Sequence, residues 1–174
     1  VEQGLCSEAL LCLKQMQLEG MSPDPVTYVS CLKACGILQA IDKGREIHAE
    51  VERQCLPKRN IVIGNALVDM YIKCGFCEKA HCVFDNLQTR DVFTWTSLIS
   101  GYADHDHAEE AIKCFSRMQV EGFHPNAVTY VSIVKSCNNI GAIDKGKELH
   151  LEIAKKGLLE ADCLLGGSLL DMYA

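Results

Sequence analysis

The sequence contains two copies of one long pattern, offset by 102 residues. VTYVS begins at Val26 and returns at Val128, and AIDKG begins at Ala40 and returns at Ala142. LVDMY at Leu67 also returns, as LLDMY. No gap is needed to keep the two copies in register. Self-similarity at a fixed period indicates structural repeats that stack on one another, rather than one globular core.

Residues 91–126 hold the clearest unit of this pattern, a pair of amphipathic helices. Polar residues separate the two helices, and Asp106 followed by Glu109 has capping-box spacing for the second one. One apolar stripe per helix cannot enclose a core alone, so the unit must pack against its neighbours. The stripes recur at i, i+3, i+4 and i+7, as Trp95, Leu98, Ile99 and Tyr102, and then Ala108, Ala111, Ile112 and Phe115.

The same stripes divide the whole chain into an all-α series of helical hairpins. We expect first helices near residues 26–36, 61–74, 92–103, 127–137 and 163–174, and second helices near 5–19, 42–54, 77–87, 107–120 and 144–156. Together they predict one elongated solenoid domain. Its repeats are a partial one at 1–24, complete ones at 25–60, 61–91, 92–126 and 127–162, and a partial one at 163–174.

Both ends of the sequence fall inside a hairpin, so we expect a slice of a longer protein. Each end would then expose an apolar stripe, and uncapped repeats tend to associate. This predicts end-to-end self-association of the isolated slice. No apolar run reaches the length of a membrane span, and we expect no membrane partner. The stripes concerned are Ala9, Leu10 and Leu13 at one end, and Leu169, Met172 and Tyr173 at the other.

Charge and cysteine content limit the function. The formal net charge is −6 with a pI near 5.5, which opposes a simple phosphate-binding surface, because nonspecific nucleic-acid affinity comes mainly from Lys and Arg. Any nucleic-acid affinity must therefore draw much of its energy from bases. The eleven cysteines fall largely on apolar stripes, where a free thiol acts as a small hydrophobe. Their odd number favours a reducing compartment.

Two groups of residues could in principle hold a metal. The first is Cys74 and Cys77 with His81 and Cys82, but Cys74 closes an apolar stripe and the following glycine suits a helix end, which favours a structural role. The second is Asp104–His107, a polar turn between helices. We expect neither metal nor cofactor. No catalytic constellation or phosphate loop is present, so an enzyme is not expected, and any deaminase domain would lie outside these residues.

Polar residues near the starts of first helices form a row on a stacked solenoid. Asn65 and Thr96 are such residues, and Asp91 and Asn126 lie beside the same row. One pair of hydrogen-bonding side chains per repeat is what base-by-base RNA reading requires. The spacing alone is also compatible with a second interpretation, in which these residues only cap helices or face solvent.

The sequence resembles the pentatricopeptide repeat family, plant PLS type, in which P, L and S repeats alternate. The resemblance covers the whole chain. It implies right-handed superhelical stacking of helix-turn-helix repeats and binding of single-stranded RNA, one nucleotide per repeat. The motifs that carry it are LVDMYIKCG with VFDNL, TWTSLISGY with EEAIKCFSRM, and VTYVS with KAC, AIDKG and EIH.

In the family, the fifth and last residues of a repeat choose the base and the second residue sandwiches it. The resemblance therefore implies adenine for Thr96 with Asn126, where the threonine hydroxyl would meet a ring nitrogen, and uracil for Asn65 with Asp91. Together these two repeats would prefer the dinucleotide 5′-UA-3′ within a single strand. Selection should be weaker at Val29 with Asn60 and at Val131 with Asp162, because valine cannot hydrogen-bond a base edge. The sandwiching residues would be Val26, Val62, Phe93, Val128 and Leu164.

The resemblance also implies a cellular role. Family members of this type act in organelle RNA processing, here RNA editing, in the mitochondrion or the chloroplast. The alternative is a protein-interaction scaffold that recruits editing cofactors or other partners, since the curved face of a solenoid also suits a peptide.

Overall fold

The computed structural model describes residues 2–159 and 163–173, which form helices joined by turns and loops and contain no strand. The helices divide into two compact units, Val1–Arg90 and Asp91–Ala174. The division lies within one residue of the boundary expected between the repeats 61–91 and 92–126. No helix among the described residues is long and apolar enough to cross a membrane.

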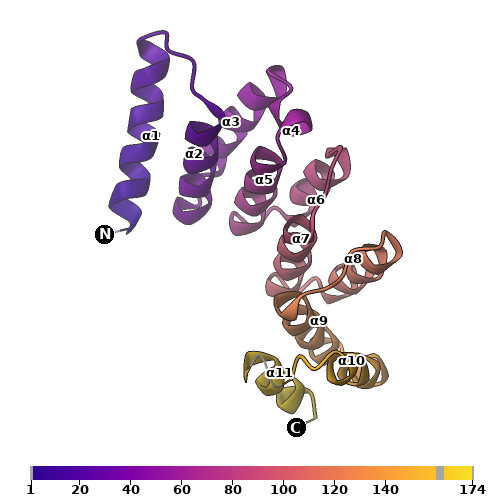
Figure 1. Cartoon of the computed structure of the whole chain (residues 1–174). Helices are drawn as coiled ribbons and strands as arrows, with labels where there is room; N and C mark the ends of the chain where they lie inside the picture. Colours follow the sequence, from indigo (N-terminus) through magenta and orange to yellow (C-terminus); the bar gives the residue numbers. More distant parts are fainter. Residues whose placement is uncertain (1, 160–162, 174) are drawn as a thin grey trace. The chain divides into compact units, whose positions relative to one another are not determined.

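The N-terminal unit contains one second helix, then two helical hairpins and one extra helical turn. Its first helices α2 and α5 lie side by side, α1 packs on the other side of α2, and α3 and α6 pack behind (Figure 1). Tyr28, Leu32, Leu67, Met70 and Phe84 are almost fully buried between them. The helices are α1 (Glu2–Leu18), α2 (Pro25–Leu38), α3 (Ile41–Arg53), α4 (Leu56–Arg59), α5 (Ile61–Lys73) and α6 (Cys77–Asn86).

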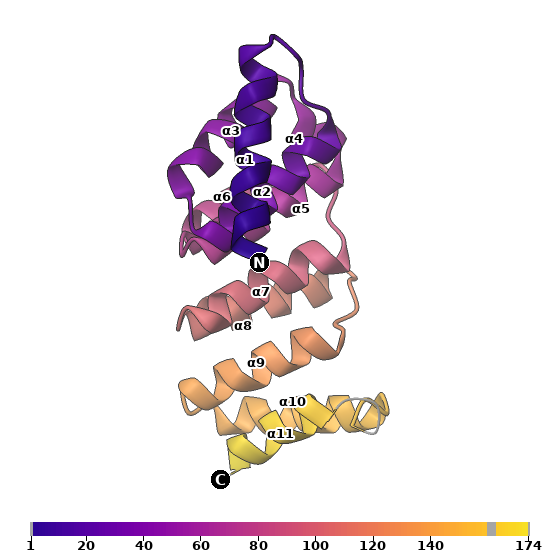
Figure 2. The ribbon, with the colours of Figure 1, turned by 90° about the vertical axis from the view of Figure 1, so that its left-hand side faces the viewer.

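The C-terminal unit repeats this arrangement. The first helices α7, α9 and α11 follow one another as one layer, with α8 and α10 as the second (Figure 2). Trp95, Phe115 and Tyr130 are its largest fully buried side chains. The helices are α7 (Val92–Asp104), α8 (Ala108–Val120), α9 (Ala127–Asn139), α10 (Ile143–Lys155) and α11 (Cys163–Tyr173).

These helices confirm the all-α prediction of paired helices, with bounds that agree within a few residues. Each first helix begins at the first residue of an expected repeat, from Pro25 to Cys163. The stripe pattern missed α4, a single turn with proline in its first turn, because four residues are too few to show a period.

The repeated motifs pack on each other, which explains why they recur together. In the N-terminal unit the glycine of AIDKG, Gly44, lies against Met70 of LVDMY. In the C-terminal unit Gly146 lies against Met172 in the same way. The absence of a β-carbon lets a second helix approach the next first helix closely at both places.

Two expectations about local structure are wrong. Asp106 is not the N-cap of the second helix: its φ is 61°, in the left-handed region, and α8 begins after His107 without a side-chain cap. The stripes at the ends are also largely covered. Tyr173 is 50% exposed, but Leu13 is fully buried where α1 packs on α2, and Leu169 and Met172 are each only 4% exposed where α11 packs on α9 and α10. These buried residues therefore do not provide an exposed surface for self-association.

Candidate nucleic-acid interface

An exposed apolar residue follows the first residue of every first helix. Five side chains of this kind are between 55% and 75% exposed, although large apolar residues elsewhere in the same helices are mostly buried. Exposed apolar side chains in equivalent places suit stacking with a flat ligand better than packing within the fold. They are Val26 and Val62 in the N-terminal unit, and Phe93, Val128 and Leu164 in the C-terminal unit. All five are the residues expected to sandwich bases.

The last residue of each described repeat caps the next first helix. Asn126 shows the geometry: its Oδ1 accepts from the backbone N–H of Thr129 and from the Thr129 hydroxyl, both at 2.9 Å. Because an N–H must face an acceptor, these bonds fix which way the amide points. Nδ2 of the exposed Asn126 therefore faces outward, with no hydrogen bond among the described residues. Asn126 thus presents a donor to any ligand.

Aspartates cap first helices in the same way, but they offer a ligand a hydrogen-bond acceptor instead of a donor. Oδ1 of Asp91 accepts from the backbone N–H and the hydroxyl of Thr94, both at 2.7 Å. Asp24 makes the same pair of bonds with Thr27, and the bond from the Thr27 hydroxyl lowers the pKa of Asp24. An ionised carboxylate has only acceptors to offer. Asp91 and Asp24 therefore present acceptors where Asn126 presents a donor.

Asn60 departs from this geometry. Its Oδ1 accepts from the backbone N–H of Val62 at 2.9 Å, one residue earlier along the helix. The residue in the place of the threonine is Ile63, which has no hydroxyl. Asn60 is therefore held by one bond instead of two.

Thr96, the expected partner of Asn126, lies in the same hydrogen-bond network. It is only 7% exposed, its Oγ1 donates to the carbonyl of Val92 at 2.7 Å, and Oγ1 of Thr129 lies 2.8 Å away. Each hydroxyl has one proton. While these contacts hold, the Thr96 proton points to Val92 or to Thr129, so Thr96 can offer a ligand only a lone pair.

Thr129 joins the two expected base-selecting residues, and sequence reasoning missed it. It belongs to the following repeat and is fully buried. One signal could have found it: threonine stands three residues after an Asp or Asn at 24 and 27, at 91 and 94, and at 126 and 129. That spacing is a capping signature, since the N-cap side chain bonds the third helical residue.

The other expected site residues are placed as follows. Asn65 is half-buried in α5, whereas its partner Asp91 belongs to the other unit. Val29 and Val131 are half-buried at equivalent places in α2 and α9. Asp162 lies outside the described residues.

The cysteine and histidine groups form no cluster of metal ligands among the described residues. Cys74 contacts the carbonyl of Cys35 at 3.8 Å, Cys77 is buried, and Cys82 is exposed. Burial raises the pKa of the Cys74 and Cys77 thiols, and raises that of Cys35 to about 12. Such thiols stay protonated, which suits packing and not nucleophilic chemistry.

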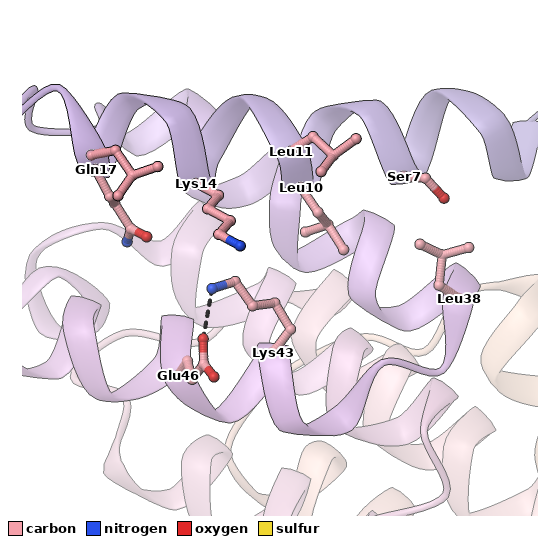
Figure 3. Close-up of a pocket in the computed structure, with 9 residues that line it drawn as sticks. Ser7, Leu10, Leu11, Lys14, Gln17, Leu38, Lys43 and Glu46 are labelled. Carbon is pink, nitrogen blue, oxygen red and sulfur yellow. Dashed lines mark hydrogen bonds and ion pairs between the residues drawn. The ribbon is translucent and has the colours of Figure 1, made fainter.

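A separate groove of about 790 Å³ lies between α1 and α3 in the N-terminal unit (Figure 3). Leu10, Leu11 and Leu38 line it, together with Lys14 and an ion pair of Lys43 with Glu46 at 2.6 Å. Most of its lining belongs to the second helices α1 and α3, with Leu38 at the end of α2, whereas the exposed apolar residues described above lie at the starts of first helices.

Comparison with known proteins gives a consistent result. The PPR repeat model matches residues 65–92, and the PPR repeat family model matches residues 90–139. A pentatricopeptide repeat-containing protein of Arabidopsis thaliana is 43% identical over 148 residues, which cover 85% of this chain and 29% of the relative. Another, named as mitochondrial, is 36% identical over 154 residues, covering 88% of this chain and 22% of the relative. The chain thus spans less than a third of the length of these relatives.

Solved structures show the same architecture. The maize pentatricopeptide repeat protein PPR10 superposes with a TM-score of 0.65 at 26% identity, over 85% of this chain and 22% of that one. PPR10 in complex with an 18-nucleotide psaJ RNA element gives a TM-score of 0.69 at 24% identity, over 84% of this chain and 22% of that one. The second likeness supports the helical repeat fold alone.

Proposed function

Because the chain belongs to the pentatricopeptide repeat family, we propose that it binds single-stranded RNA sequence-specifically, with one base for each repeat. The observation that carries the proposal is the fixed amide of Asn126, which offers an outward donor beside the lone pair of Thr96. Exposed Phe93 at the start of the same repeat supplies the stacking surface. Stacking and edge contacts together are how proteins read unpaired bases.

The donor and acceptor pattern of this repeat fits adenine. The ring nitrogen on the pairing edge of adenine accepts a hydrogen bond, which Asn126 Nδ2 can donate, and the amino group donates, which Thr96 Oγ1 can accept. This exchanges the roles expected from the sequence, where the Thr96 hydroxyl was to meet the ring nitrogen. Guanine offers a ring N–H and a carbonyl at the same places, so both contacts would be mismatched.

For the preceding repeat, whose residues Asn65 and Asp91 belong to different units, the family pattern and the chemistry of the two side chains support uracil. Asp91 presents an acceptor for the ring N–H of uracil, and the Asn65 amide can donate to a uracil carbonyl. Cytosine has an unprotonated ring nitrogen on that edge, which a carboxylate would repel. The two repeats together select 5′-UA-3′, with weak selection at the repeats that carry Val29 and Val131.

The test is a single substitution that reverses one contact. Asn126→Asp replaces the outward donor by an acceptor and keeps the cap, so preference should move from UA toward UG in competition binding with single-stranded oligonucleotides. Asn139→Asp, an exposed site in the same unit, introduces the same charge away from the interface and should leave the ranking unchanged. Identical ranking of UA, UG, UC and UU by the Asn126→Asp variant and the wild type would refute the assignment.

The charge of the chain predicts how this binding responds to salt. With a net charge of −6, few phosphates are neutralised, and the salt dependence of affinity follows the number of such contacts. Affinity should therefore change little between low and moderate salt, and it should be weak for so short a stretch of repeats.

For the whole protein we propose organelle RNA processing, specifically RNA editing, in the mitochondrion or the chloroplast. The support is the family and one relative named as mitochondrial. Cross-linking of the tagged full-length protein in plant organelles, followed by sequencing of bound RNA, tests this: recovered transcripts should share a UA-containing site next to an edited cytidine.

A second candidate function is protein binding, including editing-accessory proteins, and the groove between α1 and α3 favours it (Figure 3). Leu11 in this groove is 65% exposed, whereas its counterpart in the second copy of the pattern is the charged Lys113. Filter binding separates the two functions. Sequence-dependent retention of RNA, but not of heparin, supports RNA binding, and retention of neither leaves protein binding as the better account.

A further inference from the structure

We infer that Thr129, a residue of the repeat 127–162, is a positioning residue for the base read by the preceding repeat. The inference rests on the proposed RNA-binding function and deepens it. Thr129 does not face the ligand, because it is fully buried. It acts through Thr96 and Asn126, the two residues that would contact the base.

The contacts of Thr129 define its role. Its backbone N–H and hydroxyl bond Asn126 Oδ1, each at 2.9 Å, and its hydroxyl oxygen lies 2.8 Å from that of Thr96. One hydroxyl therefore sets the position of both reading side chains. Since productive recognition tolerates errors of only about 0.5 Å, a supporting side chain of this kind determines selectivity.

Burial makes this support effective. Thr129 is 0% exposed and Thr96 is 7% exposed, so water competes poorly for their hydrogen bonds. In such surroundings the bonds are stronger than in water, and a lost partner is costly. The proton count strengthens the argument: the Thr96–Thr129 contact needs one of the two hydroxyl protons, so the hydroxyl orientations of both residues are coupled.

The chain contains a matched position without this role. Thr27 caps α2 through its backbone N–H and its hydroxyl to Asp24, both at 2.7 Å, as Thr129 caps α9. Its hydroxyl has no second side-chain partner among the described residues. Substitution of Thr27 thus tests the loss of a cap alone, without the loss of a link between two base-selecting residues.

As a consequence, base selection by one repeat depends on a residue of the next repeat. Replacing the hydroxyl of Thr129 by a methyl group would place carbon 2.8–2.9 Å from two oxygens, closer than the usual C···O distance of about 3.3 Å. Thr96 and Asn126 would both have to shift. The base preference of the repeat 92–126 would therefore change without any change in its own residues.

The experiment compares Thr129→Val, Thr129→Ser and Thr27→Val in competition binding with oligonucleotides that differ only in UA or UG. Thr129→Val should lower the preference for adenine over guanine about 3- to 10-fold, as expected for one lost hydrogen bond. Thr129→Ser keeps the hydroxyl and should retain the preference, and Thr27→Val should leave it unchanged. Should Thr129→Val lack the helix content of the wild type by circular dichroism, Thr129→Cys, a weak donor, replaces it with the same expected fall.

The outcomes separate this inference from the function on which it rests. A wild-type protein that does not distinguish UA from UG overturns both. A wild-type protein with the adenine preference, and a folded Thr129→Val or Thr129→Cys variant with the same ratio, overturns the role of Thr129 alone. An equal fall in Thr27→Val would also overturn it, because capping would then account for the effect.

Discussion

Gly44→Ala should destabilise the protein, although alanine is the better helix former. Gly44 lies inside α3, where exchanging glycine for alanine normally gains about 1 kcal/mol. A β-carbon at this position, however, would lie 2.5 Å from Sδ and 2.8 Å from Cε of Met70. Met70 is fully buried, so its thioether has little room to move away.

The two terms have opposite signs, and the packing term is the larger. Forcing an extra carbon into a filled core costs about 1–3 kcal/mol, against the gain of about 1 kcal/mol from helix propensity. The net expectation is a loss of about 1 kcal/mol in the free energy of unfolding. Urea titration followed by circular dichroism measures it.

Gly4→Ala is the matched control. Gly4 also lies inside a helix, α1, but an added β-carbon meets nothing within 4 Å. This variant should be more stable than the wild type by up to about 1 kcal/mol. If Gly44→Ala is stabilised as much as Gly4→Ala, the close packing of AIDKG on LVDMY is not a constraint and the reasoning fails.

Two further predictions concern the interface and pH. Phe93→Ala should weaken RNA binding by about 1–3 kcal/mol through lost stacking, whereas Val120→Ala, which truncates an apolar residue 87% exposed on α8, should not; equal effects in a filter assay would contradict the stacking role. Burial lowers the pKa of His48 from its ordinary value of 6.5, so below that pH the unfolded chain binds the proton more readily and stability is lost as pH falls. His48→Gln should reduce the difference in urea midpoint between about pH 7.5 and pH 5.5, and an unchanged difference would exclude His48 as its source.

The helices could be read from the sequence because the pattern is local and appears twice. A stripe at i, i+3, i+4 and i+7 depends only on residues within one helix, and the second copy confirms the register of the first. The buried face of α7, with Trp95, Leu98 and Ile99, is the face that the stripe indicates. Spacing within a helix thus determines both its extent and its buried side.

Contacts between helices could not be read in this way. Burial of Leu13 depends on how much of α1 the helix α2 covers, which no periodicity expresses. The link from Thr96 to Thr129 joins residues 33 positions apart and depends on side-chain rotation. The predicted N-cap of α8 was wrong for another reason. Asp106 has suitable chemistry for a cap, but its left-handed backbone places it outside the helix.

Capping and base reading, which the sequence presented as alternatives, are compatible in one side chain. A cap consumes one polar atom of the last residue, and reading needs a second one that faces outward. Serine or threonine would have to serve both purposes with one hydroxyl oxygen, whereas Asn and Asp carry two polar atoms on one planar group. The last residues that cap described helices are all of this kind: Asp24, Asn60, Asp91 and Asn126. Because the inner oxygen accepts in every case, the outer atom alone differs, as a donor in asparagine and an acceptor in aspartate. Under the proposed function, the helix cap would convert this one-atom difference between two residues into a choice between bases with and without a ring N–H.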